Sequence, residues 1–224
     1  MKKIAVFLSV ILMLSTAAGC RPKEDAGAVD GGVIKVACIG ASNTRGYQLP
    51  DLDSNCYPGQ LQKIAGDKWL VMNYGVGGST IMKSGDIPYW QTLSFKTAQE
   101  FEPDIVIFDF GWNDLKPVNI GKMEKDFVKD YSEMIKLFAG LPSRPDIYII
   151  LPPLYDSPQT REGYEYLRGF YGKIIRKNNI TPIDVYTPVT AVREYFNSDL
   201  VHYSVKGCGR VAEEVYKVVS EDHP

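Results

Sequence analysis

Five apolar runs of strand length recur along the chain, and most of them are continuous and rich in valine and isoleucine. They lie at residues 33–40, 69–75, 104–110, 146–151 and 180–185. Continuous apolar strands are typical of parallel sheets that carry helices on both sides. We therefore expect these strands to be buried on both faces.

Helix-length segments with an amphipathic pattern lie between these runs. In the clearest one, residues 122–139, apolar side chains recur at intervals of three and four. The others are residues 57–65, 90–101, 164–177 and 206–219. Alternating strands and helices predict an α/β protein with a three-layer α/β/α arrangement. Five strands in this length favour a flavodoxin-like doubly wound sheet of about five parallel strands, with a strand order taken by analogy from that fold.

Four polar clusters follow the strands. GASNTRG ends the first apolar run, GVGGST and GWND end the second and third, and SDLVH comes after the fifth run and a short connecting segment. In doubly wound sheets the ligand site lies outside the carboxyl ends of the strands. We expect the four clusters to meet at that edge of the sheet.

The first 32 residues have the pattern of a targeting segment followed by a tether. Two lysines, the apolar run at residues 4–14 and the sequence STAAGC predict a signal peptide over residues 1–19, because the run is too short to span a membrane. The end of this segment resembles a bacterial lipobox, which makes Cys20 the expected lipidation site; an ordinary signal peptide with an incidental cysteine is the alternative.

Residues 20–32 are polar and rich in glycine and charge, as in a flexible tether, and residues 33–224 have the length of one domain. We expect an exported protein at the bacterial cell envelope, in the periplasm or at the cell surface. Its contact with the membrane is then the N-terminal lipid anchor alone.

Charge and cysteine content exclude several classes of function. The formal net charge is −2, from 25 basic and 27 acidic residues without long runs, which disfavours nucleic-acid binding. Cys38, Cys56 and Cys208 have no CxxC spacing and allow at most one disulfide, whose partners stay open; for Cys38, inside an apolar run, we expect a buried free thiol. With only two histidines and no cysteine cluster, we expect no transition-metal site. We also expect no cofactor.

If a histidine acts in catalysis, it is His202, because the other histidine, His223, is the penultimate residue of the chain, where we expect a frayed terminus. Asp199 precedes His202 by three residues, a spacing at which one turn places a carboxylate against the imidazole Nδ1. Ser42 lies in the first cluster between glycines and is a candidate nucleophile if His202 is near. The alternatives are an exposed Asp–His pair at the start of the last helix, and a serine that caps a helix.

Donors for a developing oxyanion are available in two further clusters. Gly77 and Gly78 allow a backbone N–H to turn inward, and Asn113 carries a side-chain amide. With the N–H of Ser42 they would form a three-donor oxyanion hole. Taken singly, the glycines also suit a tight turn, and Asn113 suits an Asx turn or a helix cap.

These clusters resemble, in order and approximate spacing, the four sequence blocks of the SGNH/GDSL hydrolases over nearly the whole of residues 33–224. The blocks GDS, the glycine block, GxND and DxxH match residues 40–46, 73–80, 111–114 and 199–202. The resemblance implies that Ser42 is the nucleophile and that His202 and Asp199 complete a catalytic triad. It also implies an oxyanion hole made by Ser42, Gly78 and Asn113.

The chain departs from the family pattern at two positions. Ala41 replaces the usual aspartate before the serine, which leaves open how firmly the serine turn is held, and Tyr203 follows His202 where proline is frequent. The resemblance implies hydrolysis of small acyl esters, acetyl in particular, often on carbohydrate, through an acyl-enzyme. The stretch Pro88-Tyr89-Trp90 and Trp112 are candidate sugar-stacking surfaces. For Arg45 a surface salt bridge is favoured over contact with an acidic sugar.

Two other functions fit parts of the pattern. In a flavodoxin-like phosphate- or FMN-binding protein, residues 42–44 would cradle a phosphate at a helix N-terminus, but Asn113 and the Asp199–His202 pair would have no role. A Rossmann site fails because Thr80 stands where the third glycine belongs. A non-catalytic carbohydrate-binding relative is disfavoured by the complete triad. The alcohol half of the ester and the oligomeric state stay open.

Overall fold

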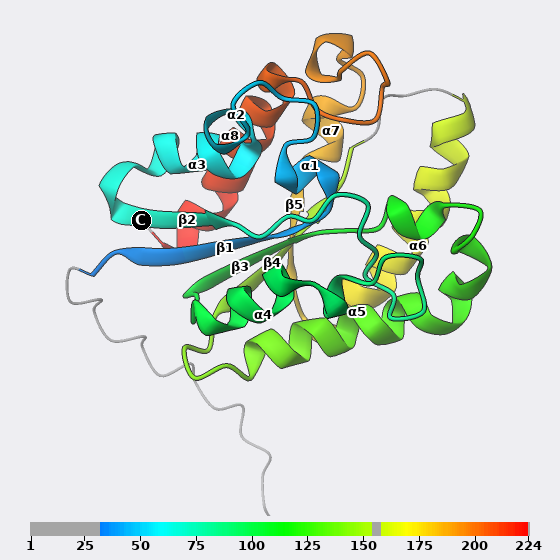
Figure 1. Cartoon of the computed structure of the whole chain (residues 1–224), viewed down its shortest axis with the longest axis horizontal. Coiled ribbons are helices and arrows are strands. Elements are labelled where there is room, and N and C mark those ends of the chain that lie inside the picture. The colour runs from blue at the N-terminus through cyan, green and yellow to red at the C-terminus, as the bar shows by residue number, and fades with distance from the viewer. Residues whose placement is uncertain (1–31, 154–157, 224) are drawn as a thin grey trace, which may run out of the picture. The chain divides into compact units, whose positions relative to one another are not determined.

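The computed structural model describes residues 32–153 and 158–223 and contains one five-stranded sheet in which every neighbouring pair is parallel. The strand order is β2-β1-β3-β4-β5, which confirms the predicted doubly wound, flavodoxin-like arrangement (Figure 1). The predicted signal peptide and Cys20, and all but the last residue of the predicted tether, lie outside the described residues. The strands are β1 (Ile34–Gly40), β2 (Trp69–Asn73), β3 (Ile105–Asp109), β4 (Asp146–Leu151) and β5 (Thr181–Asp184).

Helices cover both faces of the sheet, as the three-layer prediction requires (Figure 1). One face carries α1 (Ser42–Arg45), α2 (Leu52–Asn55), α3 (Tyr57–Ala65), α7 (Tyr186–Val189) and α8 (Val205–Asp222). The other face carries α4 (Leu93–Glu100), α5 (Met123–Ala139) and α6 (Pro158–Asn178). Each face buries its own apolar cluster. None of the helices in the described part of the chain is both long and apolar enough to cross a membrane.

Short 3-10 helices complete the connections. They are η1 (Gly66–Lys68), η2 (Tyr89–Gln91), η3 (Asn113–Leu115), η4 (Ile120–Lys122) and η5 (Arg193–Tyr195). The predicted helix at residues 90–101 is in fact η2 followed by α4, because the hydroxyl of Thr92 accepts the Phe95 N–H and caps the start of α4. The predicted helix at 164–177 begins earlier, at Pro158, and the last helix continues to Asp222.

The expectation that all strands are buried on both faces is wrong for the two edge strands. In β2 every second residue is exposed, with Leu70 at 43 % and Met72 at 39 % exposure, and in β5 only Ile183 is buried. The central strand β3 is buried throughout. An edge strand has a neighbour on one side only, so its faces are covered less completely.

The register of the central strands sets up the site. Gly40 at the end of β1 is paired with Asp109 at the end of β3, so the loops that follow these strands leave the sheet side by side. The described cysteines Cys38, Cys56 and Cys208 are buried and free, as expected for Cys38. The polar clusters predicted to meet at one edge therefore begin from adjacent strands.

Candidate active site

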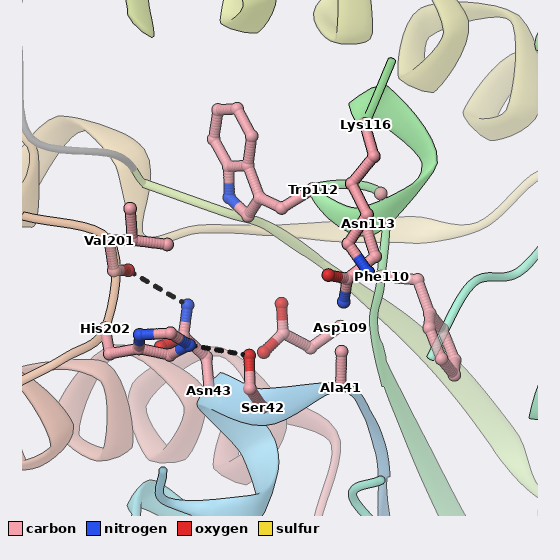
Figure 2. A pocket seen from close by; sticks show the side chains of 11 residues that line it. Ala41, Ser42, Asn43, Asp109, Phe110, Trp112, Asn113, Lys116, Val201 and His202 are labelled. Atoms are coloured by element: carbon pink, nitrogen blue, oxygen red, sulfur yellow. Dashed lines mark hydrogen bonds between the residues drawn. The ribbon is translucent and has the colours of Figure 1, made fainter. Parts of the chain in front are cut away.

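Ser42 is the first residue of α1, and its side chain points toward His202 (Figure 2). Its Oγ lies 2.9 Å from His202 Nε2, although the two residues are 160 positions apart in the sequence. Ala41, not Ser42, is the N-cap of α1, so the serine does not act as a helix cap. The predicted approach of the hydroxyl to the imidazole is confirmed.

Thr44 and Asp109 approach Gly40 too closely to leave room for a side chain. A Cβ atom at Gly40 would lie 2.1 Å from Thr44 Oγ1 and 2.6 Å from the Asp109 carbonyl oxygen, which no real structure tolerates. The N–H of Ser42 is at the first position of α1, where it has no acceptor within the helix. This N–H is therefore available as an oxyanion donor.

Asp199 orients His202. Asp199 Oδ2 lies 2.7 Å from His202 Nδ1, and Oδ1 accepts the backbone N–H groups of Val201 and His202, each at 3.0 Å. Leu200, between them, has a positive φ of 61°, which closes the turn. A proton on Nδ1 that is donated to Asp199 leaves Nε2 free to accept the hydroxyl proton of Ser42.

The surroundings of Asp199 favour its charged form. Partial burial on its own raises the pKa of Asp199, but the hydrogen bonds from the backbone and ring of His202 and from the Val201 N–H outweigh it and lower the pKa. The aspartate is therefore ionised at neutral pH and can stabilise an imidazolium. On its other side the imidazole packs against the ring of Tyr47, with 4.6 Å between ring centroids.

Asn43 joins the serine turn to the histidine loop, a role that the sequence did not reveal. Its Nδ2 donates to the Val201 carbonyl at 3.4 Å (Figure 2). Its Oδ1 accepts the Tyr203 N–H at 3.2 Å. The family often has proline at the position of Tyr203, and proline has no N–H to donate. The hydrogen bond from the Tyr203 N–H to Asn43 is therefore one that a proline could not make. The neighbouring position, His202, is thereby held close to Ser42.

Thr44 and Asp109 fix the turn from below. Thr44 Oγ1 donates to Asp109 Oδ2 at 3.0 Å, and both residues are almost completely buried. Burial raises the pKa of Asp109 to about 6, and the Thr44 hydrogen bond opposes that rise. The sequence did not indicate a role for Asp109 in the site, since an acidic residue at a strand end is unremarkable. These contacts show how the turn is held although Ala41 replaces the family aspartate.

A cavity of about 240 Å³ opens beside Ser42 and His202. Its wall contains backbone or side-chain atoms of Ala41, Ser42, Asn43, Asp109, Phe110, Gly111, Trp112, Asn113, Lys116, Val201 and His202 (Figure 2). Asn113 thus reaches the cavity as predicted, and its Nδ2 donates one hydrogen to the Ser79 carbonyl at 3.0 Å. A primary amide has a second N–H, which stays available for a ligand.

Gly78 does not line this cavity, unlike the other two predicted oxyanion donors. It adopts the left-handed φ of 80° that the predicted tight turn requires, and its carbonyl oxygen accepts a hydrogen bond from Lys116 Nζ at 3.3 Å. The loop after Gly78 is fastened by Asp114, whose carboxylate accepts the N–H groups of Ile81 and Met82. Burial raises the pKa of Asp114 to about 7.

Of the aromatic residues predicted as sugar-stacking surfaces, Trp112 borders the cavity but Tyr89 and Trp90 do not. Tyr89 is fully buried. Trp90 donates its indole N–H to the Ile81 carbonyl, and the Lys83 ammonium lies over its ring. Arg45 is exposed but takes part in none of the ion pairs of the described residues, so the prediction of a salt bridge at Arg45 is wrong.

No group of three or more His, Cys, Asp or Glu side chains within residues 32–153 and 158–223 is arranged to hold a metal ion.

The site does not suit a phosphate. The side chains of Asn43 and Thr44, which would have to cradle the anion, are engaged with Val201, Tyr203 and Asp109. The FMN- or phosphate-binding alternative is therefore not favoured.

Comparison with solved structures identifies the same fold. A carbohydrate acetylesterase from Sinorhizobium meliloti is similar with a TM-score of 0.69 and 16 % identity, over 84 % of this chain and 99 % of that chain. A carbohydrate acetylesterase family member from the same organism is similar with a TM-score of 0.65 and 20 % identity, over 84 % of this chain and 97 % of that one.

Sequence comparison gives a more specific relationship. A stretch of 126 residues is 40 % identical to an acetylxylan esterase from Xylanibacter ruminicola and amounts to 56 % of this chain and 24 % of the relative, so the match spans about a quarter of that protein. Residues 38–210, from the middle of β1 to the first turns of α8, match the GDSL-like Lipase/Acylhydrolase family. With most of its length in this match and a serine–histidine–aspartate chain at the cavity, the protein belongs to the GDSL-like Lipase/Acylhydrolase family.

Proposed function

We propose that the protein is a serine esterase that removes small acyl groups, acetyl in particular, from carbohydrate through an acyl-enzyme. The observation that carries the proposal is the chain of two hydrogen bonds at the cavity, 2.9 Å from Ser42 Oγ to His202 Nε2 and 2.7 Å from Nδ1 to Asp199 Oδ2. A serine hydroxyl is a weak nucleophile until an adjacent base accepts its proton. Here the base and the carboxylate that orients it are both in place.

In the acylation step, Ser42 Oγ attacks the ester carbonyl carbon while His202 Nε2 takes the hydroxyl proton. Asp199 stabilises the imidazolium that forms and keeps its own charge. His202 then returns the proton to the oxygen of the departing alcohol. A water molecule, activated by the same nitrogen, hydrolyses the acyl-enzyme and restores Ser42.

The negative charge on the carbonyl oxygen requires donors that are already oriented. The Ser42 N–H and the second N–H of Asn113 border the cavity and are assigned this role. Gly78 is the third donor that the family resemblance implies, but it does not line the cavity in this structure. Removal of one such donor costs about 2.7–4 kcal/mol of transition-state stabilisation.

Three features support a small acyl group on a carbohydrate. The cavity of about 240 Å³ suits a short acyl chain, and Trp112 offers an aromatic wall beside Ser42. The sequence relative named above is an acetylxylan esterase. Two structural neighbours of the protein are a carbohydrate acetylesterase and a member of a carbohydrate acetylesterase family.

The proposal is tested with purified protein and p-nitrophenyl acetate. We expect turnover by the wild type and none by Ser42→Ala, because the hydroxyl is the attacking group. Equal rates for the two proteins would reject the esterase assignment and would favour a non-catalytic, carbohydrate-binding relative. Acetate release from a panel of acetylated xylan, sialic acid and peptidoglycan then identifies the alcohol half.

We further propose that the protein is exported and held at the cell envelope by a lipid on Cys20, with residues 20–32 as a tether. The lysines, the apolar run at residues 4–14 and the small residues before the cysteine support this. Mass spectrometry of the protein from membranes should find a diacylglyceryl group on Cys20. Cys20→Ala should appear in the soluble fraction, whereas an unmodified, membrane-free wild type would contradict the anchor.

A further inference from the structure

One polar group in the cavity wall is left without a protein partner by the hydrogen bonds of the site. Asp109 is 4 % exposed, and one of its carboxyl oxygens accepts the Thr44 hydroxyl, while the other accepts no hydrogen bond from the described residues. Asp109 lines the cavity, and Figure 2 draws its carboxyl between Ser42 and Asn113.

No cation in the cavity wall compensates Asp109. Its hydrogen-bond partner, Thr44, is neutral, and Lys116, the lysine of the wall, pairs with Asp86 at 3.2 Å. Because burial raises the pKa of Asp109 to about 6, the carboxyl is ionised above that pH and can then only accept hydrogen bonds. In the free protein only water can donate to the second oxygen, and a ligand that brings a donor replaces that water, whereas an apolar group cannot.

A hydroxyl group supplies such a donor. It can donate its hydrogen to a carboxylate oxygen, whereas an alkyl group of the same size cannot. We propose that Asp109 forms a subsite for a substrate hydroxyl close to the ester, in which the free carboxyl oxygen of Asp109 accepts the hydrogen bond of that hydroxyl.

This inference rests on the proposed esterase function and adds to it a class of substrate. The hydroxyl can belong to the alcohol half, as in a partly acetylated sugar with a free neighbouring hydroxyl, or to the acyl half, as in a hydroxyacyl ester. Both sources present the same chemistry to Asp109. Two pairs of esters separate them, because each pair differs only by a hydroxyl in place of a terminal methyl group.

The first pair is 2-hydroxyethyl acetate and propyl acetate, and the second is propyl glycolate and propyl propionate. The ratio of kcat/KM within each pair is measured near pH 7.5, above the pKa of about 6 for Asp109, and is divided by the ratio of the hydroxide-catalysed rates. We expect the wild type to prefer the hydroxyl ester by about tenfold or more in one pair, the effect of one hydrogen bond to a charged group. The pair that shows the preference identifies the half of the substrate.

A variant assigns the preference to this side chain. In Asp109→Asn the amide oxygen takes over the Thr44 hydrogen bond and the NH₂ group faces the cavity, so the ratio should fall about tenfold. Asp130→Asn is the matched control, because Asp130 is also buried and accepts a backbone hydrogen bond, from Lys83, outside the cavity wall. Its ratio should equal that of the wild type.

Wild-type ratios near one in both pairs would overturn the subsite, and this outcome does not depend on the folding of any variant. An unchanged preference in folded Asp109→Asn would overturn it as well. If the wild type hydrolyses none of the four esters, or if Ser42→Ala hydrolyses them equally fast, the esterase assignment fails together with the subsite. Hydrolysis of both members of each pair at equal rates rejects the subsite alone.

Discussion

Asn43→Ala tests whether the link between the serine turn and the histidine loop positions the base. The amide is 8 % exposed and bonds Val201 and Tyr203, which flank His202 in the sequence. Truncation leaves the Tyr203 N–H buried without an acceptor and removes the longer bond to the Val201 carbonyl. The loop that carries His202 is then tied to α1 mainly through the Ser42–His202 hydrogen bond itself.

The magnitude follows from these two contacts. An unpaired buried N–H costs about 1–3 kcal/mol, and the 3.4 Å bond adds little, so we expect a loss of about 2 kcal/mol in the free energy of unfolding. For a domain of this size that loss corresponds to a fall in Tm of roughly 4–8 °C. A displacement of the base by about 1 Å costs on the order of 100-fold in rate, so kcat should fall between tenfold and 100-fold with little change in KM.

The assay combines thermal unfolding followed by circular dichroism with kcat and KM for p-nitrophenyl acetate. Asn178→Ala is the matched control, because that amide also makes two hydrogen bonds, which it donates to Ser132 and Ile174, on the opposite face of the sheet. We expect the control to lose stability but keep kcat. An Asn43→Ala protein that is destabilised like the control and retains wild-type kcat would refute the positioning role.

Three further predictions follow from the site. Asp199→Asn should lower kcat by about 10³–10⁴-fold at neutral pH, because the amide does not fix the tautomer of His202; a drop below tenfold would contradict the orienting role. Asn113→Ala should lower kcat by about 10²–10³-fold, and a change confined to KM would reject it as an oxyanion donor. Burial raises the pKa of Asp109 from 3.8 to about 6, so the folded state binds a proton more tightly than the unfolded chain. Its contribution to stability is present below pH 4 and is lost as the pH rises through about 6. Urea unfolding at pH 5 and pH 8 should therefore find that Asp109→Asn gains on the order of 1 kcal/mol relative to the wild type at the higher pH, and equal differences at both values would exclude an ionised buried carboxyl.

The sequence predicts local features well. The helix expected at residues 122–139 is α5, Met123–Ala139, because its apolar period describes the face that packs on the sheet. The approach of Asp199 to His202 was also predictable, since three residues and one turn determine it. The start of α6 at Pro158 was missed because its first turns are polar and have no apolar period.

Features that depend on distant partners could not be read from local patterns. Whether β2 and β5 are covered depends on which strands lie at the edges, and only the pairing order of the whole sheet decides that. Asn43 is part of the site because it bonds Tyr203, 160 positions away, and Asp109 because it bonds Thr44, 65 positions away. Neither residue stands out in the sequence, because a polar residue at or just after the end of a strand has many possible roles.

The separation of Ser42 from His202 by 160 positions has a consequence for folding. The acid and the base belong to one short segment and can pair while most of the chain is still unfolded, whereas the nucleophile meets the base only after the segments at either end of the domain have come together. Contacts of such long range form late and slowly. Partly folded intermediates should therefore be unable to cleave esters, and recovery of activity during refolding should report the last step of assembly.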